Sequence, residues 1–352
     1  MRHDLLTMLN IRHPIIQAPM AGVSTPALAA AVSEAGGLGS IAVGTSTPQQ
    51  ARSAIAAVRE QTSRPFNVNV FTHAAAQSDP AREAAWLDWL RPHFARFGAQ
   101  PPSALHEIYR SFLADDAMFD LLLEERPAVV SFHFGLPGQV HIDALKSAGI
   151  VLFTTATSLE EALQIEAAGI DVIVAQGIEA GGHRGMFDPT RPDPALPTLA
   201  LLEQLAGKVK LPLVAAGGIM DGRMIRTALY HGASAVQMGS AFIACPESSA
   251  PPHHRALIAQ GAGLRTELTP VISGRPARGI VNRLFTEIGA DGHPPIPDYP
   301  IAYDAAKALH AAACAAGSQD YSVNWGGTHF AQARSMPAAE LVATLAAEME
   351  EA

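Results

Sequence analysis

The sequence has few of the features that mark secreted, membrane-spanning or nucleic-acid-binding proteins. Its 352 residues include only two cysteines, Cys245 and Cys314, which are too few for a disulfide framework or a convincing metal site. No apolar run approaches the roughly 18 residues that a spanning helix needs, and residues 1–4 lack the basic-then-apolar layout of a signal peptide. The formal net charge is -9 and no Lys/Arg run is present, which argues against nucleic acid as a partner. We therefore expect a cytoplasmic protein without metal, membrane or nucleic-acid partners.

Charged and aromatic residues are also sparse. Only 16% of the residues are charged and 6% are aromatic, whereas 48% are hydrophobic. This composition is typical of a globular protein with a large core, and it is compatible with a monomer or a homodimer.

Short apolar runs alternate with Ala-rich amphipathic stretches along most of the chain. Most of the runs are continuous rather than alternating, as in parallel strands buried on both faces. Eight strands are expected, at Ile15–Ala18, Gly39–Val43, Phe66–Val70, Ala128–Phe134, Ile150–Thr155, Asp171–Ala175, Leu211–Ala215 and Ala235–Met238. Eight βα units predict a TIM-type (β/α)8 barrel, whose active site lies at the carboxyl ends of the strands.

Two segments interrupt this alternation. One follows the third strand and carries a helical pattern around Trp86, and the other follows the eighth strand and is rich in Gly and Pro before a helix near residues 302–316. Both leave the expected catalytic end, so we expect them to form a second, smaller, mainly helical substrate domain. The approximate division is 1–74, 114–267 and 328–352 for the barrel, and 75–113 and 268–327 for the cap.

The sixth strand ends in a loop that holds four glycines and one histidine, Gly177 to Gly185 with His183. Glycine lets backbone amides close on a flat or anionic ligand, and a histidine there titrates near neutrality. We expect backbone amides of this loop to contact a ligand and His183 to lie beside it. Apart from His183 and His133, the histidines, including His253 and His254 in a polar segment, are expected to be solvated.

Two further strand ends indicate a phosphate-bearing cofactor. The seventh strand runs into Gly217-Gly218, and the eighth ends in Gln237-Met238-Gly239-Ser240. Barrels that bind phosphorylated ligands often hold the phosphate between these two loops and a helix N-terminus.

Other strand ends provide groups for a planar heterocycle. Met20 is placed to lie against a ring face, and Gln176 to pair with a ring carbonyl or imide. Of Asn67 and Asn69 at the third strand, we expect only Asn69 to face inward. Three amides and two phosphate loops match the needs of flavin mononucleotide (FMN) better than those of a bare sugar phosphate.

A second histidine and a cluster of tyrosines complete the candidate residues. His133 ends the fourth strand between two phenylalanines, where a catalytic and a structural role are equally expected. Tyr303 and Lys307 are four residues apart and would share one helix face. A phenol and an ammonium directed at a flavin would suit a small anion.

Four motifs together resemble the bacterial class I nitronate monooxygenases, formerly called 2-nitropropane dioxygenases. They are Gln17 to Gly22, Pro65 to Asn69, Ser131 to Pro137 and Ala175 to Gly185. The resemblance implies non-covalent FMN, no metal, and oxidation of alkyl nitronates, notably propionate 3-nitronate, by dioxygen. The products would be an aldehyde or oxo acid with nitrite or nitrate, formed through a flavin semiquinone.

Carried onto this sequence, the resemblance implies a role for each candidate residue. His183 would be the active-site histidine, and the substrate cavity would be lined by His133, Tyr109, Tyr299, Tyr303 and Lys307. The FMN contacts would be Met20, Asn69, Gln176, Gly181, Gly217, Gly218, Gln237, Met238, Gly239 and Ser240.

Two alternative functions remain open at this point. One is an NAD(P)H-dependent flavin reductase of the same superfamily, acting on quinones or enoyl thioesters, although no second nucleotide-binding fingerprint is evident. The other is a barrel without flavin that acts on a sugar phosphate as an isomerase or synthase.

Overall fold

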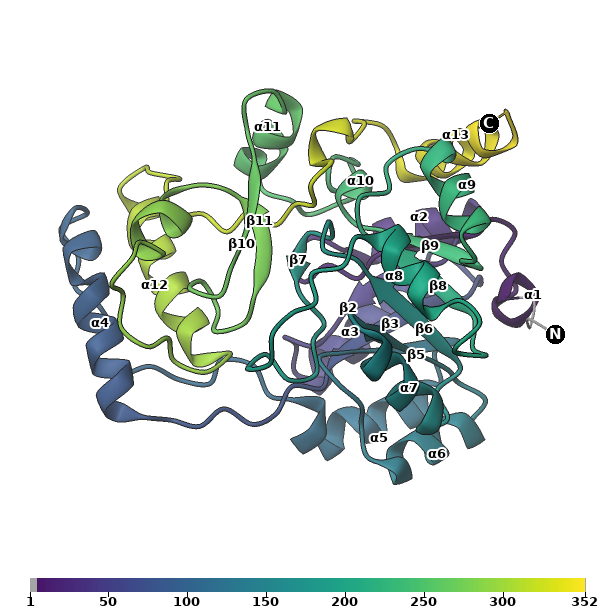
Figure 1. The fold of residues 1–352 in the computed structure, drawn as a ribbon, viewed down its shortest axis with the longest axis horizontal. Coiled ribbons are helices and arrows are strands. Elements are labelled where there is room, and N and C mark those ends of the chain that lie inside the picture. Colours follow the sequence, from purple (N-terminus) through teal and green to yellow (C-terminus); the bar gives the residue numbers. More distant parts are fainter. Residues whose placement is uncertain (1–4, 352) are drawn as a thin grey trace.

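The computed structural model describes residues 5–351, which form a barrel with a lobe at one end (Figure 1). Residues 1–4, on which the expectation about a signal peptide bears, lie outside the described range, as does residue 352 at the end of the expected barrel unit.

All eight expected barrel strands are present and pair in parallel in the order β1-β9-β8-β6-β5-β4-β3-β2. The two edge strands meet through a bridge between Ile16 and Leu38, which nearly closes the barrel. The bounds are β1 (Ile15–Gln17), β2 (Gly39–Ala42), β3 (Phe66–Phe71), β4 (Val129–His133), β5 (Val151–Ala156), β6 (Val172–Gln176), β8 (Leu213–Ala216) and β9 (Ala235–Met238). The (β/α)8 prediction is confirmed.

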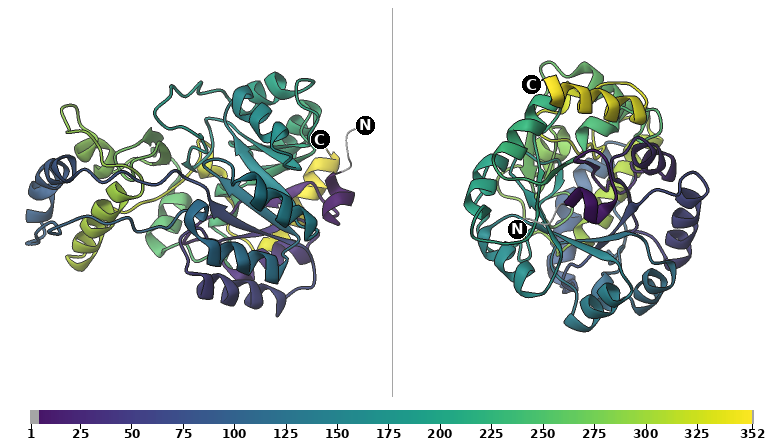
Figure 2. Two further views of the ribbon diagram at one scale, coloured as in Figure 1. Left: turned by 90° about the horizontal axis from the view of Figure 1, so that it is seen from below. Right: turned by 90° about the vertical axis from the view of Figure 1, so that its right-hand side faces the viewer.

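Helices surround the strands in a ring (Figure 2, right). Thr25 shows why one begins where it does: its hydroxyl accepts the Leu28 amide, and Pro26 takes the first helical position. The helices of this layer are α2 (Pro26–Glu34), α3 (Pro48–Arg59), α5 (Asp116–Glu125), α6 (Gln139–Ser147), α7 (Leu159–Ala167), α8 (Thr198–Leu205), α9 (Gly222–Tyr230), α10 (Ser240–Ile243) and α13 (Ala338–Glu351).

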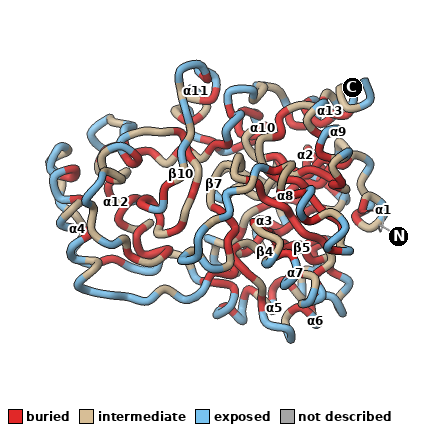
Figure 3. Tube along the Cα trace, in the orientation of Figure 1, coloured by how far each residue is buried: buried red, intermediate tan, exposed pale blue. Residues whose placement is uncertain are grey.

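Strand residues alternate between two hydrophobic clusters. Ile15 and Ile173 point outward to the helices, whereas Ile16 and Val172 fill the barrel interior. The short helix α1 (Leu5–Leu9) places Leu5 in the interior cluster and so closes the end opposite the cap. Figure 3 shows the resulting buried centre of the barrel. This packing leaves the carboxyl ends of the strands as the open end.

Both insertions contribute to a third cluster outside the barrel. Trp86 from the first insertion and Leu309 from the second belong to the same buried group. The helices of this cluster are α4 (Pro80–Ala95), η2 (Leu284–Ile288) and α12 (Ile301–Ala315). The helix η1 (Phe112–Ala114) packs on the barrel cluster instead, and α11 (Pro252–Gln260) and η3 (Phe330–Gln332) share a separate small cluster. Whether this lobe is a separate domain with the expected boundaries stays a prediction.

The sequence reading missed a second, three-stranded antiparallel sheet. It joins β10 (Thr266–Thr269) and β11 (Ala277–Ile280) to β7 (Gly182–His183). The expected boundary at residue 267 therefore falls inside β10. Thr266 to Thr269 alternate weakly and are short, so their strand character depends on the partner that the fold brings to them.

Three negative findings apply to residues 5–351. No helix in this range is long and apolar enough to cross a membrane. No group of three or more His, Cys, Asp or Glu side chains there is arranged to hold a metal ion. Cys245 and Cys314 are both free thiols.

Candidate active site

A cavity of about 460 Å³ opens at the carboxyl ends of the barrel strands and extends beneath the cap. Every residue that the sequence singled out borders this one cavity. They are Met20, Asn69, Tyr109, His133, Gln176, Gly181, His183, Gly217, Gly218, Gln237, Met238, Gly239, Ser240, Tyr299, Tyr303 and Lys307. The structure thus brings the candidate set together, while the role of each residue stays a prediction.

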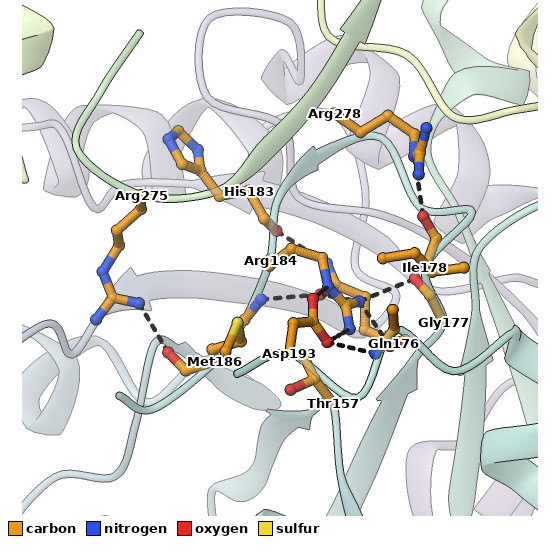
Figure 4. Close-up of polar contacts among 12 residues, drawn as sticks. Thr157, Gln176, Gly177, Ile178, His183, Arg184, Met186, Asp193, Arg275 and Arg278 are labelled. Atoms are coloured by element: carbon orange, nitrogen blue, oxygen red, sulfur yellow. Dashed lines mark hydrogen bonds and ion pairs between the residues drawn. The ribbon is translucent and has the colours of Figure 1, made fainter. Parts of the chain in front are cut away.

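The glycine loop (residues 176–185) is held from both sides. On the cap side, His183 pairs with Ala277 and the Arg184 amide donates to the Pro276 carbonyl. On the barrel side, the buried Arg184 guanidinium forms a bidentate ion pair with Asp193 and donates to the carbonyls of Gln176 and Gly177 (Figure 4). This double anchoring fixes the position of His183.

His183 is kept neutral by its surroundings. Burial, together with the nearby His133 and Arg275, lowers its pKa to about 3. Nε2 lies 2.8 Å from the hydroxyl of Ser273, which is also within hydrogen-bond distance of the Arg275 carbonyl. The orientation of this hydroxyl therefore decides which ring nitrogen of His183 carries the proton.

His133 has both ring nitrogens engaged. Nε2 donates to the His183 carbonyl at 3.2 Å, so Nδ1 is the bare nitrogen that accepts from Thr155 at 3.0 Å. Burial lowers the pKa of His133 to about 4. The ring borders the cavity, but its hydrogen bonds support the backbone of the glycine loop.

Amide side chains form the floor of the cavity. Asn69 donates to Ser131, and Gln176 donates to the His183 carbonyl and accepts from the Gly185 amide. The expectation that only Asn69 of the two strand asparagines points inward is wrong. Residues two apart in a strand share a face, and Asn67 also points inward, where its Nδ2 donates to Ser40.

The backbone at two strand ends is shaped by glycine. Gly217 and Gly218 have φ angles of 124° and 72°, a conformation that side chains disfavour. Across the cavity, a Cβ on Gly181 would lie 2.5 Å from the Gly327 nitrogen. The Ser240 hydroxyl accepts from the Gly327 amide. Main chain therefore borders this end of the cavity.

Tyrosines from both insertions meet at the other end. The Lys307 ammonium lies 4.9 Å from the Tyr109 ring centre and 5.5 Å from that of Tyr303. Tyr299 and Tyr303 both lie against the His183 ring. Burial raises the pKa of Tyr109 to about 12 and also raises that of Tyr299, so these phenols stay protonated. None of the described residues that line the cavity is Asp or Glu.

The sequence reading missed several residues of this region. His254 was expected to be solvated, but it is 3% exposed and borders the cavity, because α11 turns it inward. Trp325 lies 5.2 Å from the His183 ring. Phe134 has a φ of 83°, which is rare for a bulky residue. Arg275 is 3% exposed and lies over the Phe134 ring. No local pattern marks these positions, since each is set by contacts between distant segments.

The chain matches known proteins over nearly its whole length. A family profile described as nitronate monooxygenase matches residues 2–348. A nitronate monooxygenase of Pseudomonas aeruginosa is 58% identical over 342 residues, which are 97% of each chain. One from Paraburkholderia phytofirmans is 56% identical over 351 residues, 99% of this chain and 96% of the relative.

Solved structures are also similar to this chain over nearly its whole length. The nitroalkane oxidase of Streptomyces ansochromogenes is 40% identical, with a TM-score of 0.90 over 99% of this chain and 98% of its own. FabK from Thermotoga maritima is 28% identical, with a TM-score of 0.74 over 100% and 97%. The lower likeness to the second structure still covers both the barrel and the cap.

Proposed function

The chain belongs to the nitronate monooxygenase family and is an oxidoreductase of that activity, and on this premise we propose that it uses FMN and dioxygen to oxidise small anionic nitronates, notably propionate 3-nitronate. The single observation that carries the proposal is the chemistry of the cavity wall. It contains neutral His183, protonated tyrosines and Lys307 but no carboxylate among the described lining residues. Such a wall favours a small anion over a neutral or cationic substrate.

The residues present fit FMN. Gly217, Gly218, Gly239 and Ser240 offer backbone amides to the phosphate, and positive φ angles at the first two give the loop its shape. Asn69 and Gln176 offer amides to the ring edge, and Met20 offers an apolar wall. When bound, FMN supplies the electron transfer between the nitronate and dioxygen.

In this proposal His183 orients the nitronate. The Ser273 hydroxyl donates to Nε2, so Nδ1 carries the proton and donates it in a hydrogen bond to a nitronate oxygen. With a neutral nitroalkane the hydroxyl turns to the Arg275 carbonyl, and Nδ1 is then bare and able to accept a carbon proton. The substrate charge thus selects the tautomer.

Lys307 favours nitronates that carry a second anionic group. Its ammonium stands at the tyrosine end of the cavity and interacts with the Tyr109 and Tyr303 rings. Partial burial lowers its pKa, yet nearby Asp304 opposes the shift. A nitronate with a carboxylate at the far end, such as propionate 3-nitronate, would place one anionic group at His183 and the other at Lys307.

The proposal is tested on the purified flavoprotein by recording its flavin spectrum with propionate 3-nitronate, first without and then with oxygen, and afterwards with NADH. We expect the nitronate to change the spectrum without oxygen and to cause oxygen consumption when it is admitted, while NADH has no effect. Bleaching by NADH without any response to the nitronate would move the protein to the flavin reductases. A colourless protein free of FMN would contradict both.

His183→Asn tests the assigned histidine. Loss of the imidazole should lower kcat/KM for the nitronate by about tenfold or more, the value of one hydrogen bond to a charged group. Unchanged turnover would show that His183 does not orient the substrate. Retained FMN absorbance in the variant serves as the control for an intact fold.

A further inference from the structure

Three arginines surround the glycine loop, and they differ in how their charges are compensated (Figure 4). Arg184 is fully buried and paired with Asp193. Arg278 is half-buried, donates to the Ile178 carbonyl, and feels the attraction of Glu179 and Glu267. Arg275 is 3% exposed and forms no ion pair with any carboxylate of residues 5–351, although Asp188 and Glu161 attract it at longer range.

The hydrogen bonds of the Arg275 guanidinium go to neutral backbone carbonyls. It donates to the Met186 carbonyl at 2.7 Å and more weakly to the Phe187 carbonyl at 3.4 Å. Its central carbon lies 4.5 Å from the centre of the Phe134 ring. A buried charge without a counter-charge is costly, and burial accordingly lowers the pKa of Arg275 to about 10. The group stays charged at neutral pH, and the carboxylates of Asp188 and Glu161, which attract it, lie beyond ion-pair distance.

Phe134 is the partition between this charge and the cavity. Its ring borders the cavity, whereas Arg275 does not, and the ring lies 5.7 Å from that of His183 in an edge-on arrangement. The positive φ of Phe134 turns its side chain into this place, and hydrogen bonds from Thr72 to the flanking carbonyls of His133 and Gly135 hold the strained backbone. A thin apolar wall of this kind screens a charge less than water does.

We propose that Arg275 is a positioning residue for substrate charge: acting through Phe134, its guanidinium attracts a small anion into the cavity. The same charge helps to keep the pKa of His183 low. This inference rests on the proposed function, because it names the feature that makes the cavity select an anion.

None of the described groups that face His183 is a carboxylate. The titratable and charged neighbours that face it come from every packed element, namely His73 after β3, His133 on β4, Arg184 in the glycine loop, Tyr299 before α12, and Tyr303 and Lys307 on α12. Burial lowers the pKa of His73 and His133 to about 4 and raises that of both tyrosines. At neutral pH these groups are therefore neutral or cationic.

The test removes the charge but keeps a hydrogen-bond donor. Arg275→Gln can still donate to the Met186 carbonyl, Arg275→Lys keeps the charge without the fork, and Arg278→Gln is the matched control for loss of an arginine from the same sheet region. The probe is sodium nitrate, an unreactive planar monoanion, titrated calorimetrically into each FMN-loaded enzyme. Retained flavin absorbance and far-UV circular dichroism report the fold.

We expect Arg275→Gln to weaken nitrate binding by about tenfold or more and to raise KM for ethyl nitronate with a smaller effect on kcat. Arg275→Lys should bind nitrate nearly as wild type does, and Arg278→Gln should be unchanged. Histidine NMR should show a higher pKa for His183 in Arg275→Gln, which a merely structural loss would not predict. If Arg275→Gln does not fold, Arg275→Met, which packs flexibly against Phe134, takes its place.

The two proposals fail in different ways. The assignment to Arg275 would be overturned if wild type and Arg275→Gln bound nitrate equally well, or if Arg275→Gln and Arg278→Gln lost the same nitrate affinity. Nitronate turnover by the wild type would still support the proposed function in that case. Wild-type enzyme that binds nitrate in an Arg275-dependent manner but does not oxidise nitronates would overturn the function alone.

Discussion

The ion pair of Arg184 with Asp193 should be a major stabilising contact of the glycine loop. The Arg184 side chain is 0% exposed and that of Asp193 is 19% exposed, with the two bonds at 2.7 and 2.9 Å. Asp193→Asn keeps the shape of the side chain but leaves the buried guanidinium without its counter-charge. Removing one partner of a buried pair costs about 3–5 kcal/mol, and the partial access of water at Asp193 favours about 3 kcal/mol.

The assay is equilibrium urea unfolding of the FMN-loaded enzyme, with Glu160→Gln as the matched control. Glu160 pairs with Arg191 at 2.7 Å, but their side chains are 57% and 60% exposed. That control should change the free energy of unfolding little, since exposed pairs are screened and dynamic. If Asp193→Asn unfolds at the same urea concentration as Glu160→Gln, the reasoning about burial is refuted.

The pH dependence of this contact has a definite sign. Burial pushes the pKa of Asp193 upward, but hydrogen bonds from Arg184 and the Ala195 amide outweigh it, so the pKa lies below its ordinary value of 3.8. The contribution of the carboxylate is therefore complete above that value and is lost as the pH falls through the folded-state pKa. The stability difference between wild type and Asp193→Asn should shrink in acid below about pH 4.

Three further changes test separate parts of the site. Lys307→Met should raise KM for propionate 3-nitronate by about tenfold while affecting an alkyl nitronate without a carboxylate much less, and equal losses would contradict the role of Lys307. Gly181→Ala should weaken FMN retention, measured as the flavin absorbance that stays with the protein during dialysis, because its Cβ would lie 2.5 Å from the Gly327 nitrogen. The loss of unfolding free energy between pH 6.5 and about 4 should be smaller in His73→Phe, by up to one proton or about 1.4 kcal/mol per pH unit. The reason is that burial lowers the pKa of His73 to about 4 in the folded protein. A slope equal to that of wild type would show that His73 does not titrate on unfolding.

The sequence predicts the barrel because the patterns that indicate its strands and helices are local. Each strand is a continuous apolar run, and helix starts such as Thr25-Pro26 carry their own capping chemistry. Because the strand ends of a barrel converge, the sequence predicts that residues as distant as Met20, His183 and Ser240 lie at one cavity, as they do. The inward position of Asn67 also follows from the sequence, because residues two apart in a strand share a face and Asn67 lies two residues before Asn69.

Other features follow only from contacts between segments that are far apart in the chain. The pairing of β7 with β11 joins residues 182–183 to residues 277–278, and neither partner resembles a strand on its own. The inward turn of His254 and the placement of Arg275 over Phe134 likewise depend on how the second insertion folds back on the barrel.

Sequence alone therefore determined the barrel, the cavity at its open end and the groups that line it, because periodicity and strand-end position are properties of each segment. The tertiary structure decided the charge state and orientation of those groups, because desolvation and Coulomb interaction depend on what other segments bring near them. His183 is the clearest case. The sequence places it in the glycine loop, but its neutral state, its contact with Ser273 and the charge of Arg275 behind Phe134 arise only in the folded protein.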